Sequence, residues 1–281
     1  MPGVSHCLFL TSLAEVFPVT PHSEQPRFAV LIDADNAQAS AIVTLLGEIA
    51  KYGIASIKRA YGDWTTSRLN SWKNMLNEHA IQPVQQFGYT SGKNSTDAAL
   101  IIDAMDLLYA GRLNGFCLVS SDSDFTRLAT RLRESGMTVM GFGEKKTPRA
   151  FVGACDKFVY TEILVTADDS TETTSAPTVS RKSGKELRSD STLGKLLRAA
   201  VMSSADEDGW CYVGRIGSYI ANQAPDFDPR NYGYSKLSQL LAATEVFETQ
   251  SRATKSGQAQ KYLRPIQSKK VVKPKGRADE A

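Results

Sequence analysis

The stretch CLVSSDSD at residues 117–124 decides how the rest of the chain is interpreted. An apolar run, residues 116–119, ends in a short polar segment that carries Asp122 and Asp124, and apolar residues then recur at helical spacing. This order predicts a strand, a tight loop and a helix. In open α/β sheets the ligand site lies at the carboxyl ends of the strands, so the two carboxylates mark a candidate site.

A second stretch near the start of the chain has the same design. Residues 28–32 (FAVLI) form a continuous apolar run, as expected for a parallel strand that is buried on both faces. Asp33, Asp35 and Asn36 follow it directly. Residues two apart in a strand point to the same side, so Asp33 and Asp35 share a face if the strand extends that far. Asn36 is placed to cap the next helix, which would leave Asp33 free for other chemistry.

A third carboxylate lies at the start of a predicted helix. Ser95 or Thr96 would cap this helix, and Asp97 falls in its first turn. The three acidic element ends, at residues 33–35, 97 and 122–124, meet if the two strands are neighbours in the sheet. Clustered carboxylates repel one another unless protons or a cation compensate their charge. Carboxylate oxygens suit Mg²⁺ or Mn²⁺, so the pattern predicts a divalent metal site.

Each of these side chains also has a purely structural explanation. The helix macrodipole would favour Asp97 in a first turn, and Asp124 could be a helix cap. Asp122 is harder to explain in that way, because the expected cap lies two residues later. Lys93, in the loop before Asp97, could neutralise phosphate charge or be a solvated loop lysine. The sequence leaves these interpretations open for each residue taken singly.

Length and composition bound the class of protein. The chain has 281 residues, 42% hydrophobic and 22% charged, which is ordinary for one or two globular domains. Its four cysteines show neither a pairing pattern nor metal-type spacing, and Cys117 and Cys211 lie in apolar contexts. They are interpreted as reduced core thiols, which predicts a reducing, cytoplasmic location. No apolar run reaches membrane-spanning length, so we expect no membrane partner.

The chain divides into five segments by pattern. Residues 27–165 alternate strand and helix signals, which predicts an α/β fold with a mainly parallel central sheet and helices on both faces. Residues 166–191 are poor in large apolar residues and are predicted to be a flexible linker. Residues 192–266 show three helices and a hairpin, typical of a winged helix-turn-helix. The ends are a poorly specified arm, residues 1–26, and a basic tail, residues 267–281.

The strands and helices of the first domain can be placed individually. Strands are predicted at residues 28–33, 54–60, 81–86, 116–120, 137–142 and 157–160. Helices are predicted between them, at residues 38–51, 66–79, 96–110, 124–135 and 147–155. Known nucleotide and nucleophile motifs are absent: the sequence contains no Walker A motif, no dinucleotide fingerprint and no Gly-x-Ser-x-Gly. The acidic element ends are therefore the main chemical signal.

Four motifs in this order resemble a known family. They are FAVLIDADN at residues 28–36, YGDW at 61–64, GKNSTDAALIIDAMD at 92–106 and LVSSDSDFTRLATRLRESGMTVMGFG at 118–143. Together they are similar to the NYN domain of the LabA-like group, which belongs to the PIN-like nucleases. The resemblance implies a three-layer α/β sandwich and a metal-dependent ribonuclease that uses Mg²⁺ or Mn²⁺.

The resemblance also implies site residues, carried over position by position. The catalytic and metal-binding positions are Asp33, Asp97, Asp122 and Asp124. The supporting polar positions are Asp35, Asn36, Lys93 and Ser121. Every acidic position of the motif is filled, so nothing in it indicates an inactive enzyme.

The C-terminal segment is similar to an OST-HTH, or LOTUS, domain. The resemblance is carried by residues 193–197, 209–212, 213–220 and 232–237. It implies a winged-helix module that binds RNA or a protein partner. The candidate RNA contacts are Arg215, Tyr234, Lys236, Arg252 and Lys255. A homodimer stays open as an alternative.

These observations favour a metal-dependent endoribonuclease with an appended RNA-binding module. The second hypothesis is a regulatory protein that keeps the acidic site, turns over poorly and acts by holding RNA or a partner. The third is a phosphatase of the haloacid-dehalogenase type, in which Asp33 would be the nucleophile and Asp35 the general acid. The third hypothesis gives Asp97 no role, and the downstream Ser/Thr and Lys context that it needs is not evident.

Overall fold

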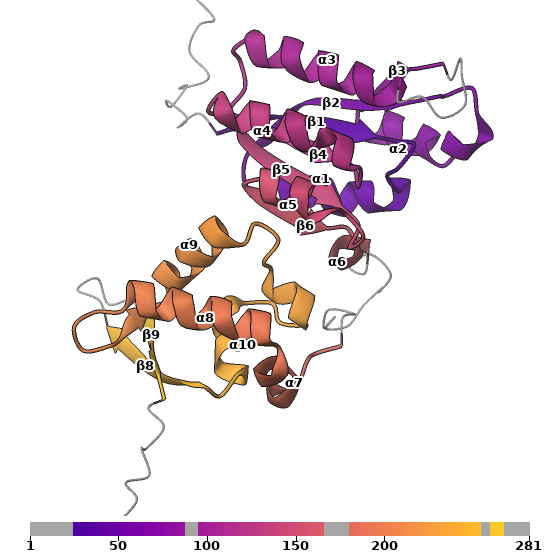
Figure 1. Cartoon of the computed structure of the whole chain (residues 1–281). Helices are drawn as coiled ribbons and strands as arrows, with labels where there is room; N and C mark the ends of the chain where they lie inside the picture. Colours follow the sequence, from indigo (N-terminus) through magenta and orange to yellow (C-terminus); the bar gives the residue numbers. More distant parts are fainter. Residues whose placement is uncertain (1–24, 88–94, 166–179, 254–258, 267–281) are drawn as a thin grey trace, which may run out of the picture.

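The structure is a computed structural model that describes residues 25–87, 95–165, 180–253 and 259–266. Figure 1 shows an α/β domain followed by a smaller, mainly helical domain. The basic tail and most of the N-terminal arm lie outside the described residues, as do Lys93 and Lys255. Within the described part of the chain, no helix is long and apolar enough to cross a membrane.

The first domain is built on a six-stranded sheet in which every neighbouring pair is parallel. In chain order the strands are β1 (Arg27–Asp33), β2 (Ile54–Gly62), β3 (Gln82–Gln85), β4 (Gly115–Val119), β5 (Thr138–Gly143) and β6 (Lys157–Tyr160). They lie side by side in the order β3-β2-β1-β4-β5-β6. The predicted mainly parallel sheet is confirmed, and each predicted strand is present within two residues of its expected bounds.

Helices cover both faces of this sheet. They are η1 (Ala39–Ala41), α1 (Ile42–Ile49), η2 (Ser67–Leu69), α2 (Trp72–Glu78), α3 (Ser95–Tyr109), η3 (Ser123–Phe125), α4 (Thr126–Glu134), α5 (Arg149–Ala154) and α6 (Glu162–Val165), where η marks a 3-10 helix. Successive residues of β1 pack on opposite faces: Val30 joins the core under α1, α2 and α6, whereas Leu31 joins the core under α3, α4 and α5. The three-layer sandwich follows from this alternation.

The strand order brings the carboxyl ends of β1 and β4 together. The two strands are adjacent and parallel, with Ile32 opposite Val119 at the end of the paired region. Because the chain leaves β1 toward β2 and reaches β4 only after β3 and α3, the order changes direction at β1. A position of this kind is a topological switch point, where α/β proteins place their ligands.

The C-terminal domain has its own core and its own sheet. Its elements are α7 (Gly184–Ser189), α8 (Ser191–Ser204), β7 (Cys211–Tyr212), α9 (Val213–Gln223), η4 (Pro229–Tyr232), α10 (Leu237–Ala243), β8 (Phe247–Ala253) and β9 (Ala259–Pro265). The three strands form an antiparallel sheet in the order β7-β9-β8. Leu197, Ile216, Leu240 and Leu263 are among the buried residues of its core. The predicted hairpin next to three helices is present.

The predicted linker is too long at its C-terminal end. Residues 184–191 were expected to be flexible, but α7 (Gly184–Ser189) lies there and buries Leu187 in the core of the second domain. Ser183 and Glu186 form a capping box that stabilises the first turn of this helix. The charged composition around a single apolar residue hid the helix, although the Ser-x-x-Glu spacing was a readable signal.

Direct contacts join the two domains, and Figure 1 places the second domain on the β6 side of the sheet. The edge strand β6 uses the N–H of Phe158 to donate to the carbonyl of Pro225 at 2.9 Å. Arg149 and Tyr160 both donate to the carboxylate of Asp226, at 2.7 and 2.9 Å. The otherwise open edge of the large sheet is thereby covered in part.

Candidate active site and metal centre

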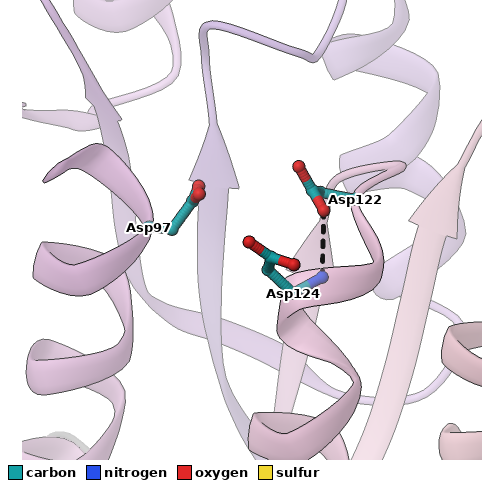
Figure 2. A group of neighbouring side chains, drawn as sticks. All are labelled: Asp97, Asp122 and Asp124. Atoms are coloured by element: carbon teal, nitrogen blue, oxygen red, sulfur yellow. Dashed lines mark hydrogen bonds between the residues drawn. The ribbon is translucent and has the colours of Figure 1, made fainter. Parts of the chain in front are cut away.

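Three aspartates converge at the carboxyl edge of the large sheet. Asp97, Asp122 and Asp124 each offer a carboxylate oxygen, and these oxygens lie within 4.8 Å of one another. Figure 2 shows Asp97, in the first turn of α3, facing Asp122 and Asp124 in the turn that follows β4. The tertiary structure therefore joins two segments that are about 25 residues apart in sequence.

The turn after β4 is held by Asp122, not by Asp124. The Oδ1 atom of Asp122 accepts a hydrogen bond from the N–H of Asp124 at 2.9 Å, which makes Asp122 the N-cap of η3. The alternative explanation of Asp124 as a helix cap does not hold, because Asp122 is the N-cap. The chain enters a 3-10 turn at Ser123, before the α-helix begins, and so the cap lies two residues earlier. The side chain of Asp124 is exposed and points toward Asp97.

Asp33 lies at the end of β1 and is fully buried, with 0% of its surface exposed. Its Oδ2 atom accepts hydrogen bonds from the Ser120 hydroxyl at 2.8 Å and from the Asn36 amide at 2.9 Å. Its Oδ1 atom is buried and has no hydrogen-bond partner among the described residues. Burial raises the pKa of Asp33, against the opposing effect of the two side-chain donors.

Ser120 connects Asp33 to the cluster of three aspartates. Its hydroxyl donates to Asp33 and accepts from the N–H of Asp122 at 3.1 Å. Ser120 was not among the site residues predicted from the sequence. The pair of serines between β4 and the first aspartate was the available signal, because a buried hydroxyl between two acidic groups can serve as donor and acceptor at once.

The supporting polar residues predicted from the sequence take different roles. Asp35 accepts from the Thr96 hydroxyl at 3.1 Å, which links the β1 loop to the start of α3. Ser121 accepts from the N–H of Glu144 at 2.8 Å and so ties the β4 loop to the end of β5. Asn36 was expected to cap a helix, and this was wrong: its amide donates to Asp33 instead. The 3-10 turn η1 starts only after Gln38, whose side chain makes no cap.

The electrostatics of the cluster favour a bound cation. Burial, followed by the negative charges of its carboxylate neighbours, raises the pKa of Asp97 to about 6. Those neighbours are Asp33, Asp122, Asp124 and Asp35. Arg68 lies 3.8 Å from Asp35, and its side chain is 75% exposed, so it compensates that carboxylate only weakly. Several hard oxygen donors, one of them buried and unpartnered, fit a divalent ion such as Mg²⁺ or Mn²⁺.

The candidate RNA contacts in the C-terminal domain differ in their exposure to solvent. Tyr234 is buried, with 3% exposed, and its hydroxyl donates to the carbonyl of Lys182 at 2.7 Å. Its assignment as an RNA contact was wrong, because its ring fills the core of the domain. Arg215 and Lys236 are exposed. Arg252 lies on the small sheet, with its guanidinium 4.5 Å from the ring centre of Tyr262.

The fold and the family models together define the class. A six-stranded parallel sheet flanked by helices, with acidic residues at its carboxyl edge, is consistent with the PIN-like nuclease superfamily. Residues 27–164 match the model of the NYN domain, and residues 188–258 match that of the OST-HTH/LOTUS domain. The chain therefore carries an NYN domain, of the PIN-like nuclease superfamily, followed by an OST-HTH/LOTUS domain, a type of RNA-binding module.

Two solved structures resemble parts of the chain. One is the crystal structure of a protein of unknown function from Vibrio parahaemolyticus, with 17% identity and a TM-score of 0.41 over 53% of this chain and 98% of that chain. The other is the solution structure of an uncharacterised protein from Nitrosomonas europaea, with 33% identity and a TM-score of 0.27 over 36% of this chain and 93% of that chain. No curated protein matches the chain significantly.

Proposed function

We propose that this protein is a metal-dependent endoribonuclease whose OST-HTH/LOTUS domain holds the RNA. The observation that supports it most is the convergence of Asp97, Asp122 and Asp124, with oxygens within 4.8 Å of one another, in an NYN domain. Asp33 would complete the site from the end of β1. The proposal assigns this NYN domain to the LabA-like group, in line with the order of the motifs, and assigns the protein to a reducing, cytoplasmic location, which the buried free cysteines support.

In this proposal the aspartates hold the ion, and the rest of the chain positions them. Asp97, Asp122 and Asp124 would be its ligands, with Asp33 at the buried side of the site. A bound Mg²⁺ or Mn²⁺ would orient the phosphodiester, stabilise its developing charge and supply an activated water. Ser120 fixes the position of Asp33 relative to the Asp122 loop through its two hydrogen bonds. Thr96 does the same between Asp35 and α3.

The second domain would act by raising the local concentration of RNA at the aspartates. Its contacts to β6 and α1 fix it beside the catalytic domain, so that RNA captured by the module stays within reach of the site. The phosphatase hypothesis has no comparable support. It leaves Asp97 without a role, whereas that residue is one of the three members of the acidic cluster.

The test is cleavage of end-labelled single-stranded RNA by the purified protein in Mn²⁺, Mg²⁺ or EDTA. We expect internal cleavage with either metal and none in EDTA. Asp124→Asn should lower the rate at least about 100-fold, because it removes a proposed ligand charge while second-shell changes alone cost 10–100-fold. Asp106→Asn is the matched control. Asp106 is exposed two turns further along α3 and takes no part in the cluster.

Three outcomes are informative. Cleavage that disappears in Asp124→Asn and persists in Asp106→Asn supports the proposed site. Cleavage that survives in Asp124→Asn, or that persists in EDTA, contradicts it. RNA binding without any cleavage would favour the second hypothesis, a regulatory protein that uses the same fold without turnover.

A further inference from the structure

The small sheet of the OST-HTH/LOTUS domain has an outer face that does not pack in the domain core. Neighbouring residues of a strand point to opposite faces. Cys211, Phe247 and Leu263 are buried on the inner face and pack in the domain core. Their neighbours in sequence, Tyr212 and Tyr262, therefore point outward, and the register places them directly opposite each other.

Aromatic rings and guanidinium groups alternate across this outer face. Arg252 lies 4.5 Å from the ring centre of Tyr262 and 5.4 Å from that of Trp210. Arg264 lies 4.8 Å from the ring centre of Trp210, and the rings of Tyr212 and Tyr262 are 5.8 Å apart. We call this set of five residues the wing ladder: Trp210, Tyr212, Arg252, Tyr262 and Arg264.

The wing ladder is partly open to solvent, with Trp210 and Tyr262 of intermediate exposure. Tyr212 is 36% exposed, and the side chains of Arg252 and Arg264 are each 37% exposed. Acidic neighbours compensate the arginines only in part. Arg264 donates to Glu248 at 2.6 Å, while Arg252 is 3.8 Å from Asp206. Surface pairs of this kind exchange readily with a stronger anion, because each is worth only about 1 kcal/mol or less.

A hollow of about 630 Å³ adjoins the ladder at Tyr212. Hydroxyl groups and a guanidinium line it, from Ser203, Ser204, Ser218 and Arg215. Gly214 is required at this point, because a Cβ there would come within 2.4 Å of the Tyr212 ring. The ring can therefore lie across the start of α9 and form the boundary between the hollow and the sheet.

We propose that the wing ladder is the surface on which this protein binds single-stranded RNA. Exposed or partly exposed rings interleaved with arginines suit unpaired bases and the phosphates between them, since bases stack on aromatic or guanidinium planes and the charge attracts the backbone. The adjoining hollow, with hydroxyl donors and Arg215, would take a flanking phosphate. This inference rests on the proposed RNA-binding function. It assigns binding to the sheet, in place of the helical side that carries Lys236.

Binding can be measured separately from cleavage. The full chain is titrated against a fluorescein-labelled 12-nucleotide single-stranded RNA of mixed sequence, in EDTA, and fluorescence anisotropy gives Kd. Tyr262→Ala should weaken binding at least about fivefold, which corresponds to the lower end of one lost base stack. Tyr262→Phe keeps the ring and should bind within about twofold of wild type. Among the described residues, the Tyr262 hydroxyl donates to Gln260 at 3.3 Å, a contact within the protein.

A charge variant provides a second, independent measurement. Arg252→Gln should weaken binding and lower the slope of log K against log salt by about 0.7, the value for one phosphate contact on a single strand. Lys185→Gln removes the same charge from α7, outside the small sheet, and should leave both quantities unchanged. Thermal unfolding of each variant shows whether the domain stays folded. If Tyr262→Ala does not fold, the comparison of Arg252→Gln with Lys185→Gln tests whether the wing ladder binds RNA.

The outcomes separate this inference from the proposed function. RNA binding that is equal in wild type, Tyr262→Ala and Arg252→Gln overturns the assignment to the ladder but leaves the nuclease proposal standing. A loss of affinity in Lys236→Gln alone would move the contact to α10 and also overturns it. A wild-type protein that binds no RNA contradicts both the ladder and the role proposed for the module.

Discussion

At the scale of single residues, Asp97 shows that negative charge in the site opposes folding. It is buried next to four other aspartates, and its pKa is raised to about 6. A carboxyl whose folded-state pKa is raised disfavours folding once it is ionised. Such a cost is tolerated where a cation offsets it, so the raised pKa and the proposed metal site have the same origin.

The sign of this effect gives a prediction for the metal-free protein. Wild-type stability should fall, relative to Asp97→Asn, as the pH rises from about 4 to about 6, because the unfolded carboxyl ionises near 3.8 and the folded one near 6. At pH 7.5 in EDTA the variant should be more stable by about 1 kcal/mol, since the favourable macrodipole term lost from α3 reduces the gain.

Chemical denaturation of both proteins between pH 4 and pH 8 measures this difference. The difference should be smallest at pH 4 and vanish only below about pH 3, where the carboxyl is protonated in both states. A difference that is constant with pH would show that charge repulsion at Asp97 is not its cause.

At the scale of elements, the turn η3 combines a structural and a chemical role in one side chain. Asp122 caps the turn through the N–H of Asp124 and also belongs to the acidic cluster. The turn holds Asp124 and starts α4, so the cap sets the geometry of the site. Ser120 also stabilises this turn, because its hydroxyl accepts a hydrogen bond from the N–H of Asp122.

Two substitutions at Asp122 should separate these roles. Asp122→Asn keeps the oxygen that accepts from Asp124, whereas Asp122→Ala removes it. In EDTA we expect Asp122→Ala to be less stable than Asp122→Asn by about 1 kcal/mol, the usual cost of a lost N-cap. Both should lose metal-dependent cleavage. Equal unfolding free energies for the two variants would rule out the capping role.

At the scale of the whole molecule, a buried ion pair joins the two domains. Glu48 on α1 is 4% exposed, and it accepts from both terminal nitrogens of Arg230 in η4, at 2.9 and 3.1 Å. Arg230 is held in turn by Asp228, and Lys51 also donates to Glu48. Burial alone would raise the pKa of Glu48, but its bonds to Arg230 and Lys51 outweigh that effect and lower it.

Removing the arginine should loosen the contact between the domains. Arg230→Ala leaves Glu48 buried, with Lys51 as its remaining partner among the described residues, so we expect a cost of about 2–4 kcal/mol, somewhat below the loss usual for a broken buried pair. The radius of gyration from small-angle X-ray scattering should increase. The stabilisation by Glu48 is present above about pH 4.5, its unperturbed pKa, and is lost as the pH falls through the lowered value.

Arg188→Ala is the matched control for this experiment. Arg188 forms a surface pair with Glu245, whose side chain is 71% exposed, and its loss should cost less than about 1 kcal/mol. Adding Glu48→Gln to Arg230→Ala should recover part of the stability, because it removes a buried charge that has lost its arginine partner. The same cost for Arg188→Ala and Arg230→Ala would contradict the importance of the domain contact.

Local patterns in the sequence were sufficient for most of the fold. The apolar run at residues 28–32 and the polar residues after it predicted β1 and the acidic strand end that carries Asp33, because a strand buried on both faces and the segment that follows it differ in composition. The same reasoning located β4 and the turn at Asp122. It failed for α7, where one buried leucine among charged residues gives no periodic signal.

What the sequence alone determined was the set of elements and the segments that carry chemistry. The tertiary structure decided which of those segments meet. The strand order sets Asp97 against Asp122, the packing of the second domain buries Tyr234, and the antiparallel register forms the wing ladder. Arg230 and Glu48 are 182 residues apart in sequence. Periodicity reports only a residue's immediate neighbours along the chain, whereas contacts of this kind depend on how whole elements pack.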